Sequence, residues 1–267
     1  MNEAFQIAAT GLQSQQLQVR TIANNLGNLN TTGYKRVRLG FADVIARTAG
    51  VDGAAPVDQA NVAAAPAVDA FSVPMGVMVS GSQRSFDPGE YRKTTAALDL
   101  AIRGNGFIEV ANPDGSVAWW RGGSMMVGSD GQLVTRGGQV LRPGITIPEN
   151  AQSLTITSDG HVQVMLPGQS QPVDAGQLQM ARFANPEMLE SQGDNLWRST
   201  EASGPAIPGR AGEDGMGLVA QGHVEASNVQ MIDEMLGLVQ AQNAYGACLK
   251  VVQAADEMNG LVNNLRR

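Results

Sequence analysis

The chain has 267 residues, of which 43% are apolar and 16% are charged, and its formal net charge is −7. A typical soluble protein carries roughly 25% charged residues, so this chain is poor in charge. Its acidic balance makes nucleic acid or an anionic membrane a poor candidate for the main partner. The single cysteine, Cys248, excludes an intramolecular disulfide and a multi-cysteine metal site. No apolar run reaches about 18 residues, so we expect no insertion into a membrane.

The missing charge is concentrated in two tracts, residues 4–34 and 235–255. The first tract contains one charged side chain, Arg20, together with nine glutamines and asparagines, and the second contains only Lys250. A helix normally displays charged side chains on its solvent side. We therefore expect both tracts to pack against other protein surfaces.

Residues 3–29 are predicted to form a helix. Two rows of residues spaced by seven give it the stripe of a coiled coil, with Gln15 as the one polar member. The rows are Phe5, Leu12, Val19 and Leu26, and Ala8, Gln15, Ile22 and Leu29. Gly27 and the asparagine-rich run that follows predict the C-terminal end of the helix, because both residue types accept left-handed backbone geometry.

The middle of the chain is predicted to be an antiparallel β domain. Asp-Gly occurs at 114–115, 130–131 and 159–160 between strand-like runs, and this dipeptide favours tight hairpin turns. The predicted hairpins pair 106–110 with 117–120, 125–127 with 133–135, and 154–157 with 161–165. Further strands are predicted at 94–103, 139–141 and 177–183. Residues 48–70 show no periodicity and are interpreted as an extended arm, with a disordered linker as the alternative.

Residues 227–265 are predicted to form a second helix, with Ser227 or Asn228 as N-cap and two acidic residues in its early turns. Its apolar positions follow a spacing of three and four residues. They are Met231, Met235, Leu238, Ala241, Tyr245, Cys248, Val252, Ala255, Met258 and Val262. The predicted fold class is α+β, with a mainly antiparallel β domain inserted between two terminal helices. The expected segments are 1–33, a helix that pairs with 224–267, then a connecting arm at 34–70 and the β-rich domain at 71–223.

The sequence contains no recognisable catalytic constellation, and we predict no catalytic residue, no cofactor and no metal. The two histidines, His161 and His223, have no nucleophile or metal ligand at a known spacing and are interpreted as surface or hydrogen-bonded residues. The run 104–106 begins like a dinucleotide-binding motif, but Glu109 stands where its third glycine belongs. A β-turn is the simpler interpretation.

Three smaller features have more than one interpretation. The basic cluster 34–36 with Arg38 could bind phosphate, while contact with an acidic neighbour or a solvated face is the simpler interpretation. Strand alternation predicts that either Trp119 or Trp120 packs inside the sheet and that the other faces outward. Cys248 lies on the apolar side of its helix and is expected to be a small buried hydrophobe.

Three blocks of sequence resemble the bacterial flagellar rod and hook proteins. They are 7–12 with 22–35 near the N-terminus, 100–107 with 130–135 in the middle, and 222–229 with 234–235 and 244–245 near the C-terminus. The blocks occur in order over essentially the whole chain. The hairpin region and the run 144–148 are most like the distal rod members of this family. The chain departs from the family pattern at 119–123, at Asn243 and at 246–248.

The resemblance implies a structural subunit and not an enzyme. Similar proteins polymerise head-to-tail, with their terminal helices in a coiled-coil layer of the filament and the β domain outside it. The implied function is that of a distal rod subunit, part of a rigid hollow shaft that transmits motor torque to the hook. A proximal rod or hook-type subunit is the alternative within the family. A β-domain enzyme with helical extensions is the distant alternative outside it.

The resemblance also implies partners and a location. The implied partners are further copies of the chain, the proximal rod proteins, the hook protein, the surrounding ring proteins and the flagellar type III export apparatus. The implied location is the periplasmic rod of the basal body. Residues 1–3 contain no basic segment, so we expect export without a cleaved signal peptide. We assign the assembly interface to Phe5, Leu12, Val19, Ile22, Leu26, Leu29, Leu238, Tyr245, Val252 and Val262.

Overall fold

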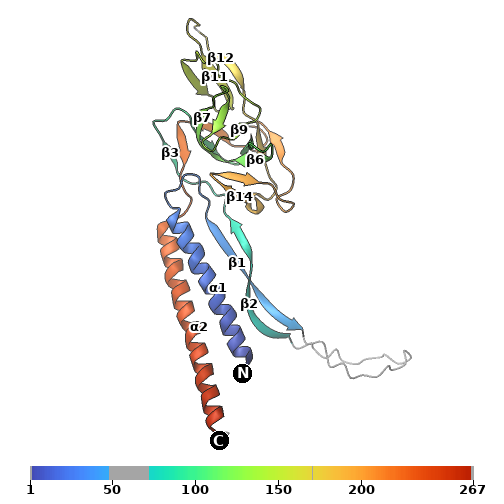
Figure 1. Ribbon diagram of the computed structural model, residues 1–267, viewed down its shortest axis with the longest axis vertical. Coiled ribbons are helices and arrows are strands. Elements are labelled where there is room, and N and C mark those ends of the chain that lie inside the picture. Colours follow the sequence, from blue (N-terminus) through green and yellow to red (C-terminus); the bar gives the residue numbers. More distant parts are fainter. Residues whose placement is uncertain (1, 48–71, 170, 266–267) are drawn as a thin grey trace, which may run out of the picture. The chain divides into compact units, whose positions relative to one another are not determined.

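The computed structural model describes residues 2–47, 72–169 and 171–265 (Figure 1). These residues form two long helices, one short 3-10 helix and eighteen strands. Contacts divide the chain into two compact units. Unit 1 consists of residues 1–23, 39–82 and 232–267, and unit 2 consists of 24–38 and 83–231. The predicted arm at 48–70 lies outside the described residues.

Unit 1 contains most of the helices α1 (Asn2–Gly27) and α2 (Met231–Leu265), which lie side by side in Figure 1. A Cβ atom on Gly11 would lie 3.3 Å from Sγ of Cys248, and one on Gly237 would lie 3.4 Å from Cδ1 of Ile22. Residue numbers rise along α1 where they fall along α2, so the helices run antiparallel. The two glycines allow their close approach, because larger side chains would push the helices apart.

Both predicted helices are confirmed, with one correction at the start of the second. α2 begins at Met231, three residues after Asn228, and neither Ser227 nor Asn228 caps it. The side chain of Asn228 instead accepts a hydrogen bond from the backbone N–H of Arg36 at 2.7 Å. The side chain of Asn228 therefore binds Arg36, which is distant in the sequence, and does not cap α2 as predicted.

The strands β1 (Val37–Arg47) and β2 (Ser72–Arg84) form a two-stranded sheet, most of which belongs to unit 1. β2 contacts α1 where the backbone N–H of Val77 donates to Oγ1 of Thr10 at 3.4 Å. Gly76 beside it has φ of +112°, and a Cβ atom there would lie 2.3 Å from the same oxygen. Glycine is therefore required at position 76 both by backbone conformation and by space.

Replacing Gly76 with alanine is expected to loosen α1 and β2 within unit 1, because the methyl group would collide with Thr10. Gly81→Ala is the matched control, since Gly81 also has positive φ, of +151°, and has no atom within 4 Å of its Cβ position. The two variants should differ by about 1–3 kcal/mol, the cost of overpacking. Hydrogen exchange of the α1 amides measures this difference. Equal exchange in both variants would contradict it.

Unit 2 is built on a large sheet whose strand order is β14-β15-β6-β5-β9-β8-β7-β4-β17, with β13 and β16 attached beside β5. The strand pairs of this sheet are antiparallel. The strands are β4 (Asp99–Arg103), β5 (Phe107–Ala111), β6 (Val117–Trp120), β7 (Gly122–Val127), β8 (Leu133–Thr135), β9 (Val140–Leu141), β13 (Met180–Arg182), β14 (Glu190–Gly193), β15 (Leu196–Arg198), β16 (Ile207–Gly209) and β17 (Leu218–Gln221).

Two smaller sheets complete unit 2. One joins β10 (Ser153–Ile156), β11 (His161–Met165) and β12 (Val173–Gln177). The other pairs β3 (Tyr91–Lys93) with β18 (His223–Glu225), and a 3-10 helix covers Pro186–Met188. The α+β fold class is thereby confirmed, with a mainly antiparallel β domain flanked by two helices.

The three hairpins predicted from Asp-Gly are confirmed as β5-β6, β7-β8 and β10-β11. The predicted strand 94–103 is shorter, because the chain turns where the N–H of Asp99 donates to the carbonyl of Ala96 at 3.3 Å. The predicted strand 177–183 is split, because the N–H of Leu178 donates to Gly160 at 2.8 Å between β12 and β13. The strand predicted at 139–141 covers Val140–Leu141.

Two apolar clusters lie inside unit 2, and both tryptophans of the pair 119–120 are buried. Trp120, 2% exposed, belongs to the larger cluster with Leu100, and Trp119, 7% exposed, belongs to the smaller one. The ring centroid of Trp119 lies 5.2 Å from that of Phe183 in an edge-to-face arrangement. The prediction that one tryptophan faces outward is wrong, because the smaller cluster, which is rich in aromatic residues, covers the other side of β6. That cluster contains Phe107, Trp119, Ala181, Phe183, Leu189 and Trp197, with Phe86 packed against it.

Candidate functional site

Large apolar side chains are exposed along one side of α2 near its N-terminal end. We call Ile232, Met235, Leu236 and Val239 the outer apolar face. Ile232 is 82% exposed, and the other three side chains are 52–58% exposed. Their spacing of three and four residues places them on one face of the helix. Because a solvent-facing helix surface is normally polar, this face is a candidate for contact with another protein.

The opposite side of α2 is buried and is lined by small or polar residues. Glu234, Ala241 and Ala255 are at most 6% exposed, and Cys248 is half-buried against Gly11. These four positions repeat every seven residues, as the heptad pattern requires. The expectation for Cys248 is therefore met only in part, since its thiol packs beside α1 without full burial.

The structure distributes the residues of the assembly interface assigned from the sequence over several environments. Ile22 is buried, Phe5 is 47% exposed and Tyr245 is 37% exposed. Leu12, Val19, Leu26, Leu29, Leu238 and Val252 are half-buried, and the side chain of Val262 lies outside the described part of the chain. The apolar positions assigned to the second helix from the sequence did not include Ile232, Leu236 or Val239. The signal that could have found these three is a second stripe on the same helix with the same spacing.

Lys35 stands at the centre of a buried ion cluster in unit 2. Its Nζ donates to Oε1 of Glu225 at 2.6 Å and to the carbonyl of Asp87 at 2.9 Å. The side chains of Lys35 and Glu225 are 0% and 3% exposed. Burial lowers the pKa of Lys35, and the charge of Glu225 opposes that shift. Among the interpretations of the basic cluster 34–36 with Arg38, contact with an acidic neighbour therefore applies to Lys35.

Arg121 completes the buried ion cluster, which consists of Lys35, Arg121 and Glu225. Its Nη1 donates to the carbonyl of Gly106 and its Nη2 to that of Gly104, both at 2.8 Å. Its Nε lies 3.6 Å from Oε2 of Glu225, and the arginine is 3% exposed. The run 104–106 thus forms a bend between β4 and β5 that presents carbonyl groups to a guanidinium. Two cations share one anion in this cluster.

Two asparagines hold the backbone of 36–37 beside the ion cluster. Oδ1 of Asn25 accepts from the N–H of Val37 at 3.0 Å, and Nδ2 of Asn25 donates to the carbonyl of Val37 at 2.9 Å. Nδ2 of Asn228 donates to the carbonyl of Ser85 at 2.9 Å. Each side-chain amide replaces a neighbouring strand as a hydrogen-bond partner. Asn25 and Asn228, one from the block near each end of the sequence, therefore have a structural role within unit 2.

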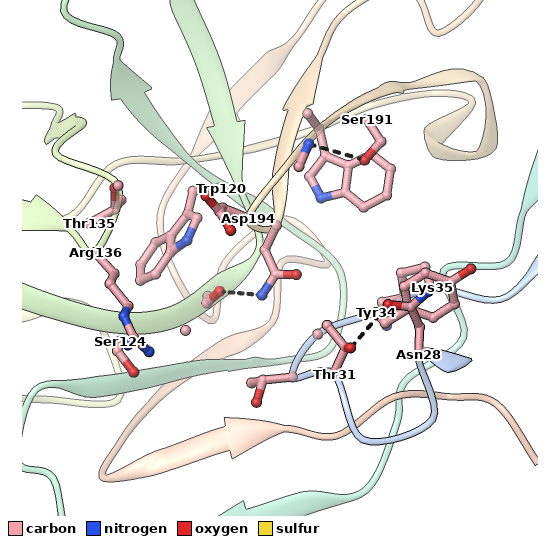
Figure 2. Close-up of a pocket in the computed structure, with 18 of the residues that line it drawn as sticks. Asn28, Thr31, Tyr34, Lys35, Trp120, Ser124, Thr135, Arg136, Ser191 and Asp194 are labelled. Carbon is pink, nitrogen blue, oxygen red and sulfur yellow. Dashed lines mark hydrogen bonds between the residues drawn. The ribbon is translucent and has the colours of Figure 1, made fainter. Parts of the chain in front are cut away.

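A cleft of about 660 Å³ opens in unit 2 between the loop that follows α1 and several hairpin turns (Figure 2). Hydroxyl, amide and glycine groups make up much of its lining. Nδ2 of Asn195 donates to the carbonyl of Gly122 at 3.0 Å. Oγ1 of Thr31 donates to Oδ1 of Asn28 at 3.1 Å, and both residues are labelled in Figure 2. Among the described residues, no group of three histidine, cysteine, aspartate or glutamate side chains could hold a metal ion.

The two histidines have the hydrogen-bonded environments that were expected. Nδ1 of His161 lies 3.2 Å from Oδ2 of Asp174 on the surface, and Nδ1 of His223 lies 2.8 Å from the carbonyl of Gln221. In the part of the chain that the structure describes, no helix is both long enough and apolar enough to cross a membrane.

Three family models match successive parts of the chain. Residues 5–35 match the flagella basal body rod protein model, and 101–164 match the D1 domain of the flagellar hook protein FlgE/F/G. Residues 220–265 match the C-terminal model of the flagellar basal body rod FlgEFG proteins. The flagellar basal-body rod protein FlgG of Caulobacter vibrioides is 40% identical over 270 residues, covering 99% of both chains. The chain belongs to the flagellar basal-body rod protein family.

Other members of this family show the same full-length relationship. FlgG of Borreliella burgdorferi is 38% identical over 100% of both chains, and the rod protein FlgF of Salmonella typhimurium is 28% identical over 96% of both. The segment that matches the N-terminal family model contains Asn25 and Lys35, and the segment that matches the C-terminal model contains Glu225 and Asn228. The two terminal blocks therefore supply both sides of the Lys35–Glu225 contact, in addition to most of α1 and α2.

Proposed function

We propose that this chain is a structural subunit of the flagellar distal rod and polymerises head-to-tail into a rigid hollow shaft that transmits motor torque to the hook. The observation that carries the proposal is the full-length relationship to FlgG rod proteins. The chain is less similar to the rod protein FlgF, and the greater similarity to FlgG supports a FlgG-type subunit. A contact between unlike surfaces of identical copies propagates without closing, as a shaft requires.

The assembly interface consists of the terminal helices. It combines the interface residues assigned from the sequence, from Phe5 to Val262, with the outer apolar face of α2. The exposure of Ile232, Leu236 and Phe5 supports this assignment, because each is a large apolar side chain without cover in the single chain. Full burial of one such side chain contributes about 1.5–3 kcal/mol, so a few of them per contact can hold neighbouring copies together.

In the assembled rod the helical segments 1–33 and 224–267 form the inner coiled-coil layer and the β-rich segment 71–223 lies outside, with 34–70 as connecting arm. The subunit acts without catalysis. Its further partners are the proximal rod proteins, the hook protein, the surrounding ring proteins and the flagellar type III export apparatus. It works in the periplasmic part of the basal body and arrives there without a cleaved signal peptide. The relatives' names as basal-body rod proteins support a location in the basal body.

Deletion of the gene tests the proposal directly. Basal bodies purified from the deletion strain should contain a rod that ends before the hook, because the distal subunits are missing, and the cells should be non-motile. Supplying the wild-type chain from a plasmid should restore full-length rods, which controls for effects on neighbouring genes. Complete rods with attached hooks in the deletion strain, seen by electron microscopy, would rule out a distal rod subunit.

A further inference from the structure

One short stretch of unit 2, residues 222–228, joins parts of the sequence that lie far apart. The N–H of Gly33 donates to the carbonyl of Glu225 at 2.7 Å, and the N–H of Arg36 donates to Oδ1 of Asn228. The N–H of Gly89 donates to Oε1 of Glu225 at 2.9 Å. We call 222–228 the closing segment. Its ion pair with Lys35 joins residues that are 190 positions apart.

The closing segment contributes the only carboxylate of the buried ion cluster. Without Glu225, the ammonium of Lys35 and the guanidinium of Arg121 would both be buried without their ion-pair partner, and only the weaker charge interaction of Lys35 with Asp87 would remain. A buried cation that has lost its ion-pair partner is less stable than a paired one, because the backbone carbonyls that remain carry only partial charges. Burying Lys35 and Arg121 together therefore has an unfavourable free energy until Glu225 lies between them.

We propose that the closing segment is a folding lock, whose entry between Lys35 and Arg121 is the last step in the folding of unit 2. The sheet strands from β4 to β17 all precede Glu225 in the sequence, so they can pair before the lock engages. A contact across 190 residues also has a high loop-closure cost until the intervening sheet has formed. Because a chain is synthesised from its N-terminus, an incomplete copy lacks Glu225 and cannot close unit 2.

Tryptophan fluorescence can follow the lock in the full-length chain. All three tryptophans, at 119, 120 and 197, are buried in unit 2, so their signal reports unit 2 alone. In stopped-flow experiments, Glu225→Gln should raise the unfolding rate more than about 100-fold, since it removes the only anion of the cluster. The folding rate should stay within about 2-fold of wild type, because the contact is absent from the transition state.

Glu90→Gln is the matched control, because Glu90 forms an exposed ion pair with Arg92 at 3.5 Å on the neighbouring strand. Both of its rates should stay within about 2-fold of wild type, as for surface ion pairs in general. If Glu225→Gln does not fold, Glu225→Asp keeps the charge and should show the same effect on unfolding, reduced in size. A slower folding rate with unchanged unfolding, or no change in either rate, would overturn the proposal.

Discussion

Replacing Ile232 and Leu236 together by aspartate is expected to abolish rod assembly. Both side chains belong to the outer apolar face and are 82% and 58% exposed, so the single chain tolerates charge there. In the rod, each aspartate would be buried against a neighbouring copy without a partner. An uncompensated buried charge costs about 3–5 kcal/mol, which would weaken each contact between copies more than about 100-fold. Motility in soft agar and electron microscopy of basal bodies measure the loss.

Two controls show whether this loss is specific. Gln240→Asp adds one aspartate, against two in the double variant, to an exposed position of α2 next to the outer apolar face, and it should leave rods intact. The urea midpoint followed by tryptophan fluorescence should match wild type in the double variant, because the tryptophans lie in unit 2. Motile cells with full-length rods carrying the double variant would show that the outer apolar face is not part of the interface.

Leu100→Ala is expected to destabilise unit 2 strongly. Leu100 is 0% exposed and lies on β4 between β7 and β17, opposite Gly123 and Gln221. Removing a buried leucine side chain leaves a cavity and costs about 2–5 kcal/mol of unfolding free energy. The surrounding strands are hydrogen-bonded on both sides of β4, so we expect little collapse and a cost in the upper half of that range. Urea unfolding followed by tryptophan fluorescence measures it.

Leu218→Ala provides the comparison on the adjacent strand. Leu218 lies on β17, paired with β4, and its side chain is 44% exposed. Truncating a half-exposed leucine should cost about 1 kcal/mol or less, because little buried contact is lost. Similar unfolding midpoints for Leu100→Ala and Leu218→Ala would mean that the cluster around Leu100 does not hold unit 2 together.

Much of the fold follows from local patterns. The heptad rows predict the first helix, the spacing of three and four residues predicts the second, and each Asp-Gly turn predicts its hairpin, because the required signals lie within a few residues of each other. The errors occur where distant residues decide the outcome. The start of α2 and the burial of Trp119 both depend on partners from other parts of the sequence.

The candidate sites divide in the same way. The charge-poor tracts point to the terminal helices as contact surfaces, and the composition of residues 4–34 and 235–255 is sufficient for that inference. The side of α2 that remains exposed could not be read from the stripe, because α2 carries apolar residues on both sides. The small residues Ala241, Cys248 and Gly237 face α1, while Ile232 and Leu236 stay exposed.

Composition and periodicity by themselves determined the class of fold, the two charge-poor helices and the hairpin turns, since these features depend on neighbouring residues. The tertiary structure alone decided which charged side chains of unit 2 are buried and which residues they pair with. A lysine that resembles part of a basic surface cluster is completely buried, and its partner Glu225 is 190 residues away. No local pattern encodes such a pair, because its free energy arises only when the folded sheet excludes water from both charges.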